Sequence, residues 1–293
     1  MKNTVVVAGA TGNLGYRICK ELIKTNANVR VIVRTGSNTE KVDSLREMGV
    51  EIVEVAMFNK AELTAACQGA ACVISAVTGL RNVIIDAQSE LLHAAIAAGV
   101  ARFIPSDFSS DFTGIPYGEN RNFDLRKEFQ ALLDDSPIQA TTIFNGCFAD
   151  ILRYNTPLFN VKAQTVAYYG DKTDWKIDFT TMDDTAAFTA AAALDATAPR
   201  FLRIASFRLS PNDLVALSGQ YKGKRFELAD MGSMEGFSAY NKMQRAQDPA
   251  GEAELYPKWQ QAQYLYSMFL VHHEALDNNR YPNLVWSGVE NNI

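Results

Sequence analysis

A short apolar segment, typical of a buried strand, runs directly into closely spaced glycines, and this feature constrains the fold of the chain more than any other. The chain reads VVVA at residues 5–8 and GATGNLG at residues 9–15, where a helical pattern begins. Glycine is needed where a backbone turns with positive φ, approaches a ligand closely or lets a helix pack on a strand. The helix start then presents free amides to a diphosphate. The pattern predicts a dinucleotide-binding loop, with a ligand-free tight turn as the alternative.

The end of the second expected strand indicates which dinucleotide would bind. Residues 29–33 run into Arg34, with Ser37 close behind, and no acidic residue occurs from Val29 to Thr39. A carboxylate at this place accepts a hydrogen bond from the ribose 2′-hydroxyl of NAD, whereas a cation and hydroxyls suit the 2′-phosphate of NADP. Arg34 as a solvated arginine at a strand end is the alternative. We expect NADP(H) to be favoured over NAD(H).

Short β-branched segments alternate with amphipathic segments through the first half of the chain. Strands are expected at residues 4–8, 29–33, 51–55, 72–75, 102–104 and 140–144, and helices at residues 13–24, 39–48, 60–67, 83–98 and 123–133. This alternation is typical of βαβ units, whose strands form a parallel sheet. The sequence therefore predicts an α/β fold with a Rossmann-type doubly wound parallel sheet.

The rhythm of the sequence changes after about residue 150. Hairpin-like and irregular segments follow, with helices expected at residues 185–194, 212–218 and 259–276, and the junction has no Pro/Gly/Ser-rich linker. We expect one structural unit, in which an NADP-binding Rossmann region (residues 1–150) carries a smaller C-terminal α+β substrate lobe (residues 151–293).

Composition and charge exclude several classes of partner. The formal net charge is −5, and 28 Lys and Arg residues are spread without a dense basic run, so we expect no direct binding to nucleic acid. The start lacks a secretory signal and no stretch is apolar for long enough to span a bilayer, so we expect a soluble, cytoplasmic protein. The four cysteines and three histidines lack metal-ligand spacing, and we expect no metal site.

Several strings resemble the NmrA-like/isoflavone-reductase-like family, whose members are atypical short-chain dehydrogenases/reductases. Besides the glycine loop these are RFIPSDF at residues 102–108, NGCF at 145–148, IDFTTMDD at 177–184 and YPNLVW at 281–286. The resemblance implies cofactor contacts at Gly9, Thr11, Gly12, Asn13, Leu14, Gly15, Arg34, Ser37, Ala76, Val77, Thr78, Gly79, Pro105, Ser106, Asp107 and Phe108. The chain departs from the family at Val55-Ala56, where many relatives carry Gly-Asp against adenine.

The resemblance implies an NADPH-dependent reductase for a small, aromatic or conjugated substrate. Its NmrA side implies an alternative, a non-catalytic NADP(H)-sensing regulator that binds a partner protein. Six aromatic residues are candidates for the wall of an apolar substrate cleft between the two halves, although aromatic residues also build cores. They are Phe108, Phe112, Tyr117, Tyr154, Trp175 and Phe179.

The catalytic residue is expected on the helix at residues 123–133. The two Tyr-x-x-x-Lys strings of the chain begin at Tyr16 and Tyr168, where neither follows a strand that would deliver it to the nicotinamide. Isoflavone-reductase-like enzymes instead use a lysine within Phe-x-x-Lys, and an ungapped alignment places Arg126 at that position. Helical periodicity puts Arg126 beside the apolar stripe and Lys127 almost opposite.

Arg126 and Lys127 would do different chemistry. A guanidinium keeps its charge at any working pH and is a poor proton donor, although it can stabilise negative charge on a substrate oxygen. An alignment slipped by one residue would restore Lys127 as the acid. Both residues are candidates, and a solvated helix face is the alternative for both.

Overall fold

A six-stranded parallel sheet forms the centre of the first half of the chain. In a computed structural model, which describes residues 3–56 and 59–290, its strand order is β3-β2-β1-β4-β5-β6. The strands are β1 (Thr4–Ala8), β2 (Asn28–Arg34), β3 (Glu51–Val55), β4 (Ala70–Ser75), β5 (Arg102–Ile104) and β6 (Gln139–Ala140). The order reverses between β1 and β4, as in doubly wound sheets. The predicted α/β Rossmann-type fold is confirmed.

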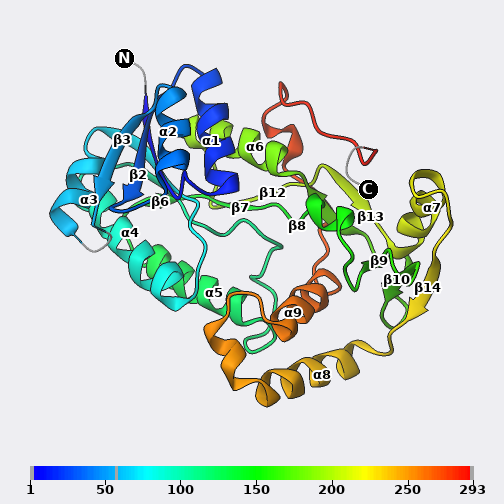
Figure 1. Cartoon of the computed structure of the whole chain (residues 1–293). Helices are drawn as coiled ribbons and strands as arrows, with labels where there is room; N and C mark the ends of the chain where they lie inside the picture. Colours follow the sequence, from blue (N-terminus) through cyan, green and yellow to red (C-terminus); the bar gives the residue numbers. More distant parts are fainter. Residues whose placement is uncertain (1–2, 57–58, 291–293) are drawn as a thin grey trace.

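Helices cover both faces of this sheet because successive residues of each strand point to opposite faces (Figure 1). Val5 and Val7 of β1 enter a core with the helices of one face, and Val6 enters a second core with those of the other face. The first face carries α1 (Asn13–Lys24), α2 (Thr39–Glu47) and α6 (Met182–Leu194), and the second carries α3 (Lys60–Cys67), α4 (Gln88–Ala97) and α5 (Arg121–Asp134). A π-helix (Asn82–Ala87) leads into α4.

The expected strand at residues 140–144 is instead two short strands. β6 ends at Ala140, and β7 (Thr142–Phe144) pairs in parallel with β12 (Phe201–Arg203). The switch of pairing from β5 to β12 begins at Thr142, since its backbone amide donates to the carbonyl of Arg200 (2.8 Å). Next, β11 (Ile177–Thr180) lies between β8 (Cys147–Phe148) and β13 (Phe207–Leu209). These small sheets lead the chain out of the Rossmann region.

The boundary expected near residue 150 between a Rossmann region and a substrate lobe stays a prediction. Residues on both sides of this boundary pack into the same core. Helix α6 follows that point in the sequence, yet its Ala186 and Phe188 lie in the same core as β1 and α1. Tyr281 and Trp286, near the end of the chain, pack on Phe188 of α6. The second half thus supplies part of the Rossmann core.

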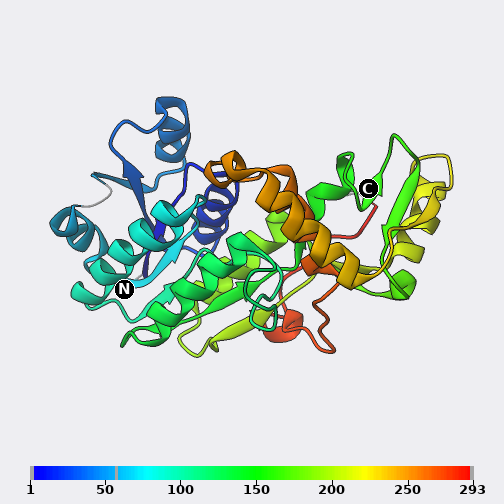
Figure 2. The same cartoon turned by 90° about the horizontal axis from the view of Figure 1, so that it is seen from below.

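The rest of the second half forms a lobe at the far end of the molecule (Figure 2). It contains a three-stranded sheet of β9 (Phe159–Asn160), β10 (Thr165–Tyr168) and β14 (Glu227–Asp230). Its helices are α7 (Pro211–Tyr221), α8 (Met234–Gln247) and α9 (Lys258–Met268), with 3-10 turns at Ala149–Arg153, Lys172–Asp174 and Pro249–Ala253. A further 3-10 turn, Asn278–Arg280, lies against the Rossmann region, where Arg280 pairs with Asp195. The sequence reading missed α8, and α9 ends eight residues before the expected end at residue 276. Among the helices of residues 3–56 and 59–290, none combines the length and the hydropathy of a membrane-spanning segment.

Candidate functional site

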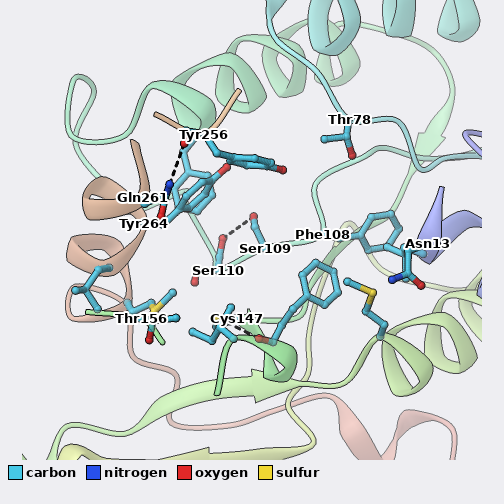
Figure 3. A pocket seen from close by; sticks show the side chains of 18 of the residues that line it. Asn13, Thr78, Phe108, Ser109, Ser110, Cys147, Thr156, Tyr256, Gln261 and Tyr264 are labelled. Carbon is cyan, nitrogen blue, oxygen red and sulfur yellow. Dashed lines mark hydrogen bonds between the residues drawn. The ribbon is translucent and has the colours of Figure 1, made fainter. Parts of the chain in front are cut away.

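The cofactor residues expected from the sequence lie at the carboxyl ends of the parallel strands. Ligands of doubly wound sheets bind at this edge, where the strand order reverses. A cavity of about 470 Å³ opens there, lined by the glycine loop and by the segments after β4 and β5 (Figure 3). The expected cofactor residues in its lining are Gly12, Asn13, Leu14, Ala76, Thr78, Ser106 and Phe108.

The glycine loop leaves no room for side chains where the backbone segments meet. Gly9 has a φ of +85°, and a Cβ there would lie 2.4 Å from the carbonyl oxygen of Ala76. A Cβ on Gly15 would lie 2.3 Å from the carbonyl oxygen of Gly9. Helix α1 begins next to the cavity, and its N-cap residue, Gly12, supplies no side-chain hydrogen bond. The first-turn amides of α1 lack a capping side chain, which suits a diphosphate.

Arg34 and Ser37 lie at the end of β2, outside the cavity lining. The amide and hydroxyl of Ser37 both donate to the carbonyl of Arg34, at 2.9 and 2.7 Å, so the turn is well defined. The guanidinium of Arg34 is exposed and makes no hydrogen bond or ion pair with any residue that the structure describes. A free guanidinium at this position fits a ribose 2′-phosphate.

Hydrogen bonds hold the segments after β4 and β5 against each other. The hydroxyl of Ser106 donates to the carbonyl of Val77 (2.5 Å), and the amide of Ser106 donates to Gln88 at the start of α4 (2.9 Å). Val77 and Gly79 are half-buried beside this contact, and Pro105 is buried behind it. The backbone that would face a nicotinamide is therefore fixed before any ligand binds.

Asp107 is fully buried and does not line the cavity. One carboxylate oxygen accepts hydrogen bonds from Gln130 (3.1 Å) and Thr142 (3.2 Å), while the other has no partner among the described residues. Burial raises the pKa of Asp107, although the nearby Arg126 opposes this shift. The arrangement gives Asp107 a supporting position beneath the site.

Arg126 lines the cavity and Lys127 does not. The Nε of Arg126 donates to the carbonyl of Ser106 (3.2 Å), and its Nη1 donates to the carbonyl of Asn122 (2.9 Å). Its Nη2 has no hydrogen-bond partner in the described part of the chain, so one edge of the guanidinium is left for a ligand. The carbonyls of Ser106 and Asn122 thus orient the positively charged guanidinium of Arg126. No carboxylate among the described lining residues neutralises its charge.

Lys127 lies on another side of α5. Its ammonium donates to the carbonyl of Ile115, lies 3.6 Å from Asp124 and sits 4.4 Å from the centre of the Tyr117 ring. Burial lowers the pKa of Lys127, although Asp124 opposes this shift. These contacts give Lys127 partners away from the cavity.

Of the aromatic residues expected at the substrate, Phe108 lines the cavity. The rest of the aromatic wall comes from residues that were not expected there. They are Phe123, Phe148, Tyr256 and Tyr264. The side-chain Nδ2 of Asn122 donates to the Tyr264 hydroxyl (3.0 Å). A polar layer joins α5 to α9, in which Asn120 donates to Ser267 (3.1 Å) and accepts from Gln260 (2.9 Å). The usable signal was the aromatic-rich helix expected from residue 259, although its contact with α5 was not predictable.

The other five aromatic residues expected at the substrate lie elsewhere in the structure. Phe112 and Phe179 are fully buried in cores, while Tyr117 and Tyr154 are 70% and 65% exposed. Trp175 donates its indole N–H to the carbonyl of Met268 (3.1 Å). None of the five lines the cavity. Within residues 3–56 and 59–290, no cluster of His, Cys, Asp and Glu is arranged to hold a metal ion.

Comparisons with known proteins agree with this geometry. The chain is 30% identical over 256 residues to pinoresinol reductase 1 of Arabidopsis thaliana, covering 80% of this chain and 79% of that protein. It is 27% identical over 243 residues to a phenylcoumaran benzylic ether reductase of Ginkgo biloba, covering 77% of each chain. These relatives are reductases, and they give no support to a regulatory protein.

Solved structures share the whole fold. The structure of AtPrR2 with NADP+ and (+)pinoresinol superimposes with a TM-score of 0.79 at 25% identity, covering 99% of this chain and 97% of that one. The leucoanthocyanidin reductase–NADPH complex from Vitis vinifera gives 0.80 at 19% identity over 99% and 97%, which shows the fold alone. A family model described as the NmrA-like family matches residues 1–274, and the chain belongs to this family.

Proposed function

We propose that this protein is an NADPH-dependent reductase that acts on a small aromatic or conjugated substrate. One observation carries the proposal: a single cavity joins the uncapped start of α1, the backbone after β4 and β5, the free edge of Arg126 and an aromatic wall. A dinucleotide site and an apolar, mostly aromatic substrate site then share one space. By their names, the relatives described above reduce pinoresinol and phenylcoumaran benzylic ethers, which supports the same substrate class.

The glycine loop and the segments after β2, β4 and β5, which together form the loop edge of the sheet, have residues that suit each part of NADPH. The first-turn amides of α1 would hold the diphosphate, and Arg34 with Ser37 would hold the 2′-phosphate. Thr78, Ser106 and Phe108 would line the nicotinamide end. Bound there, the cofactor supplies a hydride to the substrate. The 25% identical neighbour, whose structure contains NADP+, supports this choice of dinucleotide.

Arg126 would stabilise the negative charge that develops on a substrate oxygen as the carbon beside it gains a hydride. Its two bonds to backbone carbonyls fix the guanidinium in place, so little reorganisation is needed when the charge appears. No carboxylate among the described lining residues competes for this charge.

Calorimetry and turnover test the proposal together. NADPH is expected to bind more tightly than NADH, and NADPH is expected to be oxidised with at least one member of a panel of enones, quinones and benzylic ethers. Arg126→Ala is expected to lower kcat by about 10²- to 10³-fold, the loss typical of one charge-stabilising group. The control is Arg46→Ala, which removes an arginine that is 60% exposed on α2.

Three results would contradict the proposal. They are equal affinity for the two dinucleotides, no turnover over the panel, and full activity in Arg126→Ala. A loss in Lys127→Ala with Arg126→Ala unaffected would instead support the slipped alignment and Lys127 as the acid.

A further inference from the structure

The cavity contains few groups that could give a proton to a substrate. Among the described lining residues, aspartate, glutamate, histidine and lysine do not occur, and the ionisable side chains are Arg126, Cys147, Tyr256 and Tyr264. A reductase that adds a hydride to a carbonyl or conjugated carbon must also deliver a proton to balance the reaction. The donor is therefore one of these side chains or water.

Two of these side chains are poorly suited to the task. A guanidinium keeps its proton at any working pH, so Arg126 is not a usable proton donor. Burial raises the pKa of the Cys147 thiol, and its Sγ lies 3.5 Å from the carbonyl oxygen of Phe148. A thiol that is buried and turned to backbone gives up its proton reluctantly.

The two tyrosines differ in what their hydroxyls contact. The Tyr264 hydroxyl accepts a hydrogen bond from the side-chain Nδ2 of Asn122 (3.0 Å), and the Tyr264 ring packs edge-on against Phe123 with centroids 5.3 Å apart. The Tyr256 hydroxyl has no hydrogen bond with any described residue, and the residue is 51% exposed. The two rings lie beside each other, 6.4 Å apart, across the cavity from Asn13 and Phe108 (Figure 3).

We propose that Tyr256 is the proton donor of the proposed reduction and that Arg126 stabilises the tyrosinate left behind. The inference rests on the proposed function. Hydride from NADPH forms the new C–H bond, the π pair of the substrate moves to its oxygen, and that oxygen takes the proton of the Tyr256 hydroxyl. Solvent reprotonates the half-exposed Tyr256, so substrate, NADPH and one proton give reduced substrate and NADP+.

The electrostatics of the site support this pairing. Burial and the neighbouring Tyr264 raise the pKa of Tyr256, while the positive charge of Arg126 lowers it. Both side chains line the same cavity, so the guanidinium of Arg126 favours the charged form of the phenol. The half-exposed position keeps a path open for the returning proton.

The test compares Tyr256→Phe with a matched control. Tyr240→Phe makes the same change at a tyrosine that is 52% exposed on α8, and both substitutions remove only a hydroxyl. In single turnovers with saturating NADPH, Tyr256→Phe is expected to lower the rate by about 10²- to 10⁴-fold, the usual contribution of a general acid. Tyr240→Phe is expected to match the wild type. The alkaline fall in the wild-type rate is expected to vanish in Tyr256→Phe.

A second readout needs no cofactor. In the protein labelled with fluorotyrosine, fluorine NMR identifies the Tyr256 signal by its loss in Tyr256→Phe. The midpoint of its titration is expected to rise in Arg126→Leu, because the positive charge that lowers the pKa of Tyr256 is removed. An unmoved Tyr256 midpoint would overturn the pairing.

The kinetic outcomes separate the two proposals. If the wild type oxidises NADPH and Tyr256→Phe keeps more than about a tenth of that rate, water or Tyr264 donates the proton and the inference fails while the reductase stands. If the wild type oxidises no NADPH with any substrate, the reductase itself fails.

Discussion

The glycine-loop edge of the sheet and the aromatic wall of the cavity face each other, but they are built in different ways. The loop edge uses backbone from segments that directly follow β1 and β4, and its geometry depends on the absence of side chains at Gly9 and Gly15. The wall uses side chains from distant parts of the chain, as when Tyr264 of α9 packs on Phe123 of α5. A site of this kind can keep its cofactor part while the wall changes from one substrate to another.

The largest expected effect is a loss of stability at Phe112, which tests whether this aromatic residue belongs to a core or to the wall. Phe112 is a sequence candidate for the wall, yet it is fully buried with ring centroids 5.4 Å from Phe123 and 5.2 Å from Phe144. Phe112→Ala is expected to lower the free energy of unfolding by about 3 to 5 kcal/mol, measured by urea denaturation. Tyr154→Ala, at a residue that is 65% exposed, should change it by less than about 0.5 kcal/mol. Intact stability with a raised KM would make Phe112 a wall residue.

The loop edge is tested next, at its tightest contact. Gly9→Ala combines a strained positive φ with a Cβ 2.4 Å from backbone, so we expect a loss of about 2 to 4 kcal/mol in the free energy of unfolding and weaker NADPH binding. Gly49→Ala is the matched control, because Gly49 has a φ of +79° and open space around it. Equal losses in the two variants would mean that close approach at Gly9 contributes nothing.

Arg34 tests the loop edge more finely, because a contact with the 2′-phosphate affects binding of NADPH and not of NADH. Removal of a charged hydrogen bond to phosphate should cost about 1.5 to 3 kcal/mol of binding free energy, so Arg34→Ala is expected to weaken NADPH and leave NADH unchanged in calorimetry. Arg46→Ala on the neighbouring helix α2 should affect neither dinucleotide. A parallel loss for NADPH and NADH would show that Arg34 does not contact the 2′-phosphate.

The smallest effect concerns an ion-pair cluster far from the loop edge. His273 lies between two carboxylates, with Nδ1 2.9 Å from Asp178 and Nε2 3.5 Å from Asp111. Arg203 donates to Asp111 (2.7 Å) and Arg208 to Asp178 (2.7 Å). Burial lowers the pKa of His273, but the two carboxylates outweigh burial and raise it from 6.5 to about 8.

A raised histidine pKa stabilises the folded chain below the ordinary pKa, and the gain is lost as pH rises through the folded value of about 8. Because His273 is only partly buried, we expect about 1 kcal/mol between about pH 6 and about pH 9. Urea unfolding of the wild type and His273→Gln at both pH values measures the difference. The same pH dependence in both proteins would contradict the assignment.

Local patterns predicted the fold because the glycine loop, the strand ends and the helices around them are determined within short stretches of sequence. The bounds of β1, α1, β3 and α3 match the expected ones. The strand at residues 140–144 divided because Thr142 pairs with a segment about sixty residues later, which periodicity does not report. Helix α8 was missed because its apolar face is narrow, with only Phe237 and Asn241 buried.

The part of the candidate site that follows the strands could be predicted from the sequence, whereas the aromatic wall could not. The residues after β1, β4 and β5 were identifiable because the carboxyl ends of parallel strands share one edge. Helical periodicity also placed Arg126 and Lys127 on different sides of α5. Tyr256 was not identifiable, because it lies in an irregular segment before α9, and contacts between α5 and α9 bring it to the cavity.

A crystal structure of the protein grown with excess NADPH tests the central claim most directly. The account predicts diphosphate oxygens at the first-turn amides of α1, the 2′-phosphate at Arg34 and the nicotinamide between Phe108 and the free edge of Arg126. A nicotinamide outside the cavity, or a loop edge without cofactor at saturating NADPH, would contradict it.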